Sequence, residues 1–99
     1  MFPDRYPRMH EIFGAYFNQD FDLWGDTIPE IVACYKRDSP PDYHRELITE
    51  IDSFLDEHSK DLDSAFQRDC YSGFNPALWG YTTASFLDEL KRLLGEQAP

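Results

Sequence analysis

The fold is decided between Thr27 and Glu57, where the chain has the sequence TIPEIVACYKRDSPPDYHRELITEIDSFLDE. Thr27 stands three residues before Glu30, with Pro29 between them. This arrangement is a capping box with a proline in the first turn, and it marks the start of a helix. The apolar residues that follow recur at helical spacing and predict a helix over residues 28–38. Its expected inner face carries Ile28, Ile31, Val32 and Tyr35.

The segment Ser39-Pro40-Pro41-Asp42 ends this helix and starts the next one, with Ser39 as the expected N-cap. The next helix should be the longest and should cover residues 41–57. We expect it to turn apolar residues inward, namely Leu47, Ile48, Ile51, Phe54 and Leu55. Its expected outer face carries acidic residues, namely Glu46, Glu50, Asp52, Asp56 and Glu57.

Three further helices are predicted on either side, over residues 7–18, 60–69 and 83–94. Gly14 lies inside the first and costs about 1 kcal/mol against alanine unless close packing requires it. Ser59 is the expected N-cap of the second, and Thr82 or Thr83 that of the third, which Gly95 ends at the C′ position. The expected core residues are Met9, Ile12, Phe13, Tyr16, Phe17, Leu62, Ala65, Phe66, Phe86, Leu87, Leu90 and Leu94.

Two irregular stretches, residues 18–26 and 70–80, separate these helices and are rich in aromatic and turn-forming residues. The sequence therefore predicts an all-α fold, a compact single-domain bundle of about five helices with two ordered aromatic-rich loops. We expect one domain over residues 1–99, with an ordered core over about 6–95. Aromatic residues make up 16% of the chain, which supplies an efficient core for 99 residues.

The chain is strongly acidic, with 19 Asp and Glu against nine Lys and Arg and a formal charge of −10. Such a charge repels nucleic acid and anionic membranes and attracts a basic partner. The alternative is that it serves only solubility. We expect no secretory signal, because no basic region precedes an apolar stretch, and no membrane span, because no apolar run approaches about 18 residues.

No motif for catalysis or metal binding is complete. His10-Glu11-Ile12-Phe13-Gly14 begins like a zinc-protease helix but lacks the second histidine, and His44 and His58 are expected on polar helix faces. Asp20, Asp22 and Gly25 resemble part of a calcium loop, whose other ligand positions hold Trp24 and Ile31. Cys34 and Cys70 match no metal-ligand spacing and are interpreted as reduced, packed thiols, with a disulfide as the alternative. We predict no enzyme, catalytic residue, cofactor or metal.

The segment Tyr16-Phe17-Asn18-Gln19-Asp20-Phe21-Asp22, with Gly25-Asp26-Thr27 and the Pro-Glu helix start after it, resembles bacterial contact-dependent growth inhibition immunity proteins. That family characteristically has Tyr-Phe-His-Gln-Asp-Trp-Asp at this point. Cys70-Tyr71, Pro76 and Leu87 continue the resemblance, which runs from about Tyr6 to Leu94. Asn18 and Phe21 depart from the family pattern, as does the segment from Ser72 to Ser85.

The resemblance implies an all-helical, cytoplasmic bacterial protein that binds and neutralises the cognate C-terminal toxin domain delivered by neighbouring cells. Many such toxins are nucleases with basic active sites, so the implied partner is a basic toxin domain in a 1:1 complex. An acidic adaptor that binds another basic protein is the alternative function. A small metal-dependent enzyme using Asp20, Asp22 and Asp26 is a third possibility.

The family members face different toxins, so the shared motif is expected to maintain the fold. Its residues are Tyr16, Phe17, Gln19, Asp20 and Asp22. Recognition should rest on what differs, and large aromatics on loops are typical interface anchors, although they also plug the ends of small bundles. The expected toxin-binding residues are Asp52, Asp56, Glu57, Asp61, Asp63, Phe74, Trp79 and Tyr81.

Overall fold

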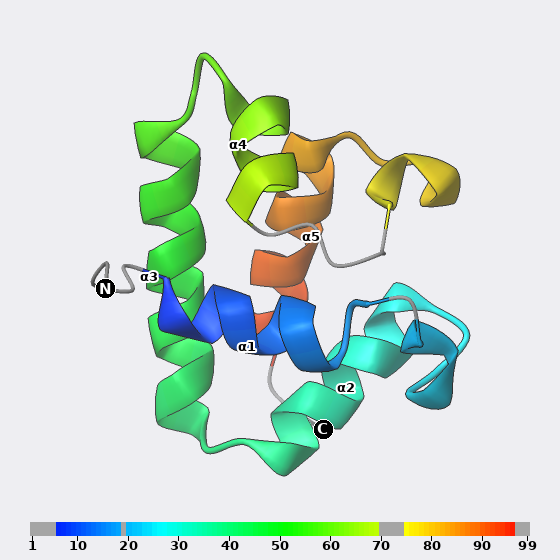
Figure 1. Ribbon diagram of the computed structural model, residues 1–99. Coiled ribbons are helices and arrows are strands. Elements are labelled where there is room, and N and C mark those ends of the chain that lie inside the picture. The colour runs from blue at the N-terminus through cyan, green and yellow to red at the C-terminus, as the bar shows by residue number, and fades with distance from the viewer. Residues whose placement is uncertain (1–5, 19, 70–74, 97–99) are drawn as a thin grey trace.

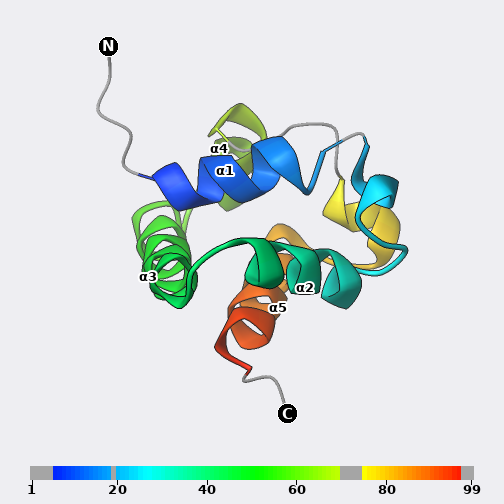
Figure 2. The same ribbon diagram turned by 90° about the horizontal axis from the view of Figure 1, so that it is seen from below.

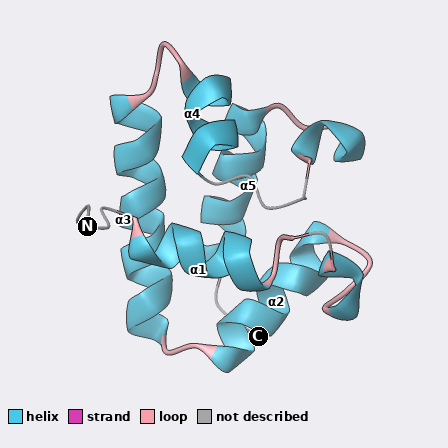
Figure 3. Ribbon diagram, in the orientation of Figure 1, coloured by secondary structure: helices cyan, strands magenta, loops and turns pink. Residues whose placement is uncertain are grey.

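The computed structural model describes residues 6–18, 20–69 and 75–96 (Figure 1). These residues form five α-helices, α1 (Pro7–Ala15), α2 (Ile28–Asp38), α3 (Pro41–Glu57), α4 (Leu62–Asp69) and α5 (Thr83–Gly95). Two 3-10 helices, η1 (Phe21–Leu23) and η2 (Pro76–Trp79), lie in the connections. The predicted all-α fold is confirmed, and Figure 3 shows the helices joined by short loops. No helix in the described ranges has the length and hydropathy needed to cross a membrane.

The helix α3 forms one edge of the molecule, and α1 runs across it (Figure 1). The last helix, α5, packs against α2, α3, α4 and η2, so it contacts most of the other elements of the bundle. The two 3-10 helices lie at the edge opposite α3 in both views (Figures 1 and 2).

The core is one cluster of apolar side chains drawn from all five helices. Phe86 lies at its centre, since its ring contacts those of Phe13, Phe17, Phe66 and Tyr81 at centroid distances of 5.4–6.3 Å. The buried members are Tyr6, Met9, Ile12, Phe13, Phe17, Ile28, Ile31, Val32, Tyr35, Leu47, Ile51, Phe54, Ala65, Phe66, Phe86, Leu87, Leu90 and Leu94. The inner faces predicted from spacing are therefore confirmed, with Tyr16, Ile48, Leu55 and Leu62 partly buried at the margin.

The bounds predicted for α2 and α3 agree with the structure. Thr27 accepts a hydrogen bond from the backbone N–H of Glu30 at 3.2 Å, as the capping box predicts. Of the two candidates at the start of α5, Thr82 is the cap, and it forms a capping box with Ser85. Local signals decide these helix starts because each cap satisfies backbone donors that the helix leaves open.

The helix α1 ends at Ala15, three residues before its predicted end. The backbone N–H groups of Tyr16 and Phe17 both donate to the carbonyl of Ile12, at 2.9 Å each, and close the last turn. Asn18 then donates from its side chain to the carbonyl of Gly14 at 2.9 Å. Gly14 itself is exposed, with open space where a Cβ would stand, so close packing does not require it.

Three predicted caps, at Ser39, Ser59 and Gly95, are wrong. Ser39 closes α2 instead of opening α3, because its hydroxyl donates to the carbonyl of Tyr35 at 2.5 Å; Pro40 is the N-cap of α3. The helix α4 begins at Leu62, because residues 58–61 form a turn and leave Ser59 exposed.

Gly95 is the last residue of α5 and not a left-handed C′ residue. Lys36 donates to the carbonyls of Leu93, at 2.9 Å, and of Glu96. This side chain from α2 satisfies the end of α5, so the helix needs no glycine cap.

Candidate functional site

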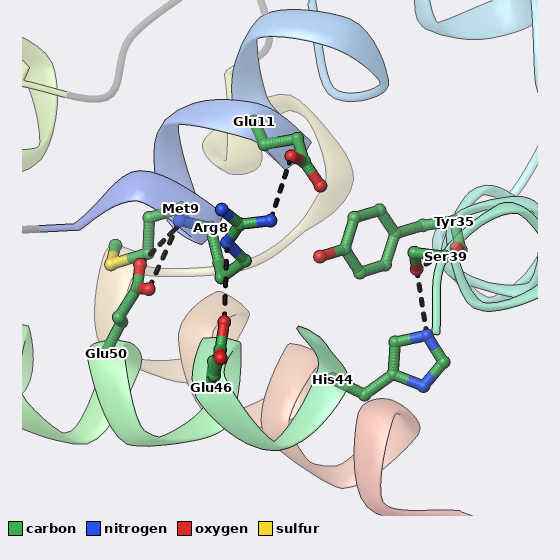
Figure 4. Close-up of polar contacts among 8 residues, drawn as sticks. All are labelled: Arg8, Met9, Glu11, Tyr35, Ser39, His44, Glu46 and Glu50. Atoms are coloured by element: carbon green, nitrogen blue, oxygen red, sulfur yellow. Dashed lines mark hydrogen bonds and ion pairs between the residues drawn. The ribbon is translucent and has the colours of Figure 1, made fainter. Parts of the chain in front are cut away.

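A carboxylate from α3 caps the start of α1 (Figure 4). Glu50 accepts hydrogen bonds from the backbone N–H groups of Arg8, at 3.2 Å, and Met9, at 2.9 Å. The side chain of Tyr6, the N-cap residue of α1, does not cap the helix. Glu50 was predicted on the outer face of α3, and this is wrong, because the open donors of α1 draw its carboxylate inward.

Arg8 ties the same two helices together from the side (Figure 4). Its guanidinium forms ion pairs with Glu11 at 3.2 Å and with Glu46 at 3.6 Å, and it lies 4.0 Å from the centre of the Tyr43 ring. The cation thus sits between carboxylates and an aromatic face. These contacts use Glu46 and Glu50 for structure and leave them out of a recognition surface.

His44 is buried, with 9% of its surface exposed, and the prediction of a polar position is wrong. Its Nε2 lies 2.9 Å from the Ser39 hydroxyl, and its ring lies 5.7 Å from that of Tyr35 (Figure 4). Burial lowers the pKa of His44 and raises that of Tyr35 to about 12, so both side chains are neutral near pH 7. His58 is half-buried, and its ring packs 4.8 Å from that of Phe54. The bundle covers His44, whereas His58 follows the last residue of α3 as its C-cap.

The predicted recognition acids gather where α3 ends and α4 begins, at the top of Figure 1. All five are exposed. Asp52 is paired with Lys91 at 2.5 Å, and Asp61 lies 3.3 Å from Nδ1 of His58. Asp56 and Asp63 form no ion pair with a cation in the described ranges. The structure therefore brings Asp56, Glu57, Asp61 and Asp63 together at one end, and we call these four the acidic end.

Two of the three predicted aromatic anchors lie at the margin of the core. Trp79 and Tyr81 are half-buried, and both pack against the core at the η2 side. The Tyr81 ring meets that of Phe86 at 6.3 Å. Phe74 lies outside the described residues, as does Gln19 of the family motif.

Within the motif, the two aromatic residues point inward and the acids outward. Phe17 is 0% exposed, and its ring lies 5.4 Å from that of Phe86. Tyr16 packs on Trp24 at 4.8 Å and donates from its hydroxyl to Asp38 at 3.2 Å. Asp20, just before η1, and Asp22, within it, are both exposed.

Asn18 takes the place of the histidine that is usual in the family. Besides its bond to Gly14, it accepts a hydrogen bond from the backbone N–H of Asp20 at 2.8 Å. This pair of bonds starts the turn that leads into η1.

Sequence reasoning missed two exposed leucines. Leu23 in η1 is 77% exposed and Leu78 in η2 is 82% exposed. Each begins a Leu-Trp-Gly tripeptide, at residues 23–25 and 78–80. The repeat marks the two segments as alike in sequence, but nothing in it shows that the leucines point to solvent.

A groove of about 840 Å³ lies between α2, the start of α3 and the end of α5, at the end of the molecule opposite the acidic end. Its lining is basic as well as apolar, with Lys36, Arg37 and Arg45 among the residues on its walls. The Asp38 and Asp42 carboxylates pair with the two arginines. Within the described ranges, no three His, Cys, Asp or Glu side chains are grouped to hold a metal ion.

The family model of the CdiI immunity protein matches residues 5–94. The chain belongs to this family. No curated protein and no solved structure matches it significantly.

As a CdiI immunity protein, the chain is an inhibitor and not an enzyme, and its function is to neutralise a toxin of contact-dependent growth inhibition. Its functional site is therefore a surface for a protein partner.

Proposed function

We propose that this immunity protein binds a basic toxin domain, a nuclease, in a 1:1 complex in the bacterial cytoplasm. The observation that carries the proposal is the acidic end, Asp56, Glu57, Asp61 and Asp63, on a chain of formal charge −10. A nuclease must attract phosphate, so its active site is basic, and an exposed group of carboxylates offers it a competing anionic surface.

The positions of the cations add to the uneven distribution of charge over the surface. Arg8, Arg37, Arg45, Lys91 and Arg92 are all engaged with neighbouring carboxylates. Lys36, Arg37 and Arg45 line the groove at the other end of the molecule. The acidic end holds four carboxylates and one exposed lysine, Lys60, whereas the groove walls carry three cations, so a basic partner approaching by diffusion is steered to the acidic end.

Co-purification tests the proposal directly. The immunity protein and a catalytically inactive form of the C-terminal toxin domain encoded immediately upstream are co-expressed and purified at moderate salt. We expect a complex whose mass, measured by light scattering, equals one copy of each chain. No complex with that domain, or a complex with an acidic domain that lacks nuclease activity, would overturn the proposal.

A matched pair of charge reversals tests the acidic end. Asp56→Lys and Asp42→Lys change the net charge equally, but Asp42 lies beside the groove and pairs with Arg45. We expect Asp56→Lys to slow toxin association more than Asp42→Lys does at low salt, and the difference to shrink as salt rises. Equal rates for the two variants would show that total charge, and not the acidic end, steers the toxin.

A further inference from the structure

Two turns on one side of the molecule carry the same tripeptide, Leu-Trp-Gly. In the first, Leu23 is the last residue of η1 and Trp24 and Gly25 follow it; in the second, Leu78 and Trp79 end η2 and Gly80 follows. Leu23 and Leu78 project into solvent, whereas Trp24 and Trp79 are half-buried against the core. We call residues 20–26 and 75–80 the paired turns. Both lie at the edge opposite α3 in two perpendicular views (Figures 1 and 2).

Each turn is held by contacts that leave its leucine free. In the first, the Cys34 thiol donates to the carbonyl of Trp24 at 3.1 Å. Gly25 lies so close to α2 that a Cβ there would stand 2.6 Å from Cβ of Glu30. Only glycine permits this approach, so the turn is fixed against the first turn of α2.

The second turn is fixed by its own hydrogen bonds. Asn75 accepts from the backbone N–H of Ala77 at 3.1 Å, and the N–H of Tyr81 donates to the carbonyl of Pro76 at 3.1 Å. Gly80 has a φ of +84°, a left-handed conformation that side chains rarely adopt. The backbone is therefore set before any partner arrives, which lowers the entropic cost of binding.

The leucines are unusual on this surface. Among the side chains whose burial the structure describes, Leu23 and Leu78 are the large apolar ones that the bundle leaves exposed. A single exposed leucine is ordinary, but two exposed leucines, each on a turn held by its own contacts and on the same side of the molecule, gain from being covered by a partner. Asp20, Asp22 and Asp26, all exposed, border Leu23.

We propose that the paired turns dock the cognate toxin domain, with Leu23 and Leu78 as apolar anchors and Asp20, Asp22 and Asp26 as an acidic rim. This rests on the proposed function, because the rim requires a partner that presents cations round an apolar centre. Charge complementarity selects that partner over a second copy of this chain, since two copies of charge −10 repel each other. Trp24 and Trp79, which follow the two leucines in sequence, pack against the core and hold the turns in place. The leucines themselves make the proposed contact with the toxin.

The test compares the wild-type chain with Leu23→Ser/Leu78→Ser in binding to the inactive upstream-encoded toxin domain. Ala33→Ser, an exposed position on the groove, is the control for the loss of an exposed apolar group. We expect the double variant to bind at least tenfold more weakly, mainly through faster dissociation, and each single variant to lie between. We expect the control to bind like the wild type.

Because both leucines are exposed, the variant should keep the helical circular dichroism and urea midpoint of the wild type, which separates binding from folding. A folded double variant with wild-type affinity would overturn the inference while leaving the proposed function intact. Loss of self-association alone, seen by light scattering without weaker toxin binding, would assign the two leucines to contact with a second copy and overturn the inference too. Failure of the wild-type chain to bind the toxin domain would overturn the proposed function and the inference together.

Discussion

The crossing of α1 over α3 and the paired turns use polar groups in opposite ways. At the crossing, Glu50 caps α1 across the helix interface and Arg8 is enclosed by Glu11, Glu46 and Tyr43. At the paired turns, Asp20 and Asp22 face solvent beside the exposed Leu23. Charges at the crossing hold two helices together, and charges at the turns remain available to a partner.

This contrast predicts which side chains contribute to the stability of the fold and which contribute to binding. A side chain engaged inside the protein stabilises the folded state and is expected to have little effect on binding. A side chain left exposed on a rigid turn contributes little to stability and can be used for recognition. Variants in matched pairs, one from each class, test whether the separation holds.

The largest expected effect is the loss of the Phe17 ring. Phe17→Ala removes a fully buried aromatic that packs on Phe86, so we expect the free energy of unfolding to fall by about 3–5 kcal/mol. Leu23→Ala, six residues later but 77% exposed, should leave it nearly unchanged. Urea denaturation followed by circular dichroism measures both. Equal losses would contradict the proposed structural role of the motif.

The second pair lies on one helix. Glu50→Ala deprives Arg8 and Met9 of the acceptor for their backbone N–H groups, and we expect a loss of about 1–3 kcal/mol. Asp56→Ala, on the exposed end of α3, should have no measurable cost to folding. Thermal unfolding of the two variants compares them directly. If Asp56→Ala were the more damaging, the division between structural and available carboxylates would fail.

Two glycines give changes of opposite sign. Gly14→Ala adds a methyl group to open space within α1 and should stabilise the protein by about 0.5–1 kcal/mol. Gly80→Ala must adopt a φ of +84° and should destabilise it by about 1–2 kcal/mol. Chemical denaturation resolves the difference, and a loss at Gly14 would show that its backbone is constrained in a way that the contacts do not reveal.

The smallest expected effect depends on pH. Because burial lowers the pKa of His44 in the folded state, the unfolded chain takes up this proton first as pH falls. The contribution of neutral His44 is therefore complete above about pH 6.5 and is lost as pH falls below it. Between pH 7.5 and 5.5, we expect the melting temperature of the wild type to fall more than that of His44→Gln. Equal falls would mean that His44 titrates alike in both states.

The sequence by itself determined the helices that carry their own signals. Thr27 and Glu30 specified the start of α2, and the spacing of apolar residues specified the inner faces of all five helices. These features are local, since a cap or a helical stripe involves residues three or four positions apart. The family motif likewise pointed to an immunity protein before any contact was known.

Only the tertiary structure decided which polar residues are used inside the molecule. Glu50, His44 and Lys36 look like surface residues in sequence. Each nevertheless forms a hydrogen bond with a group 5 to 60 positions away along the chain. The exposure of Leu23 and Leu78 was equally hidden, because a leucine in an irregular stretch carries no periodicity to show which way it points. Such choices depend on which helix ends and core faces come together in space, and packing across the bundle sets that arrangement.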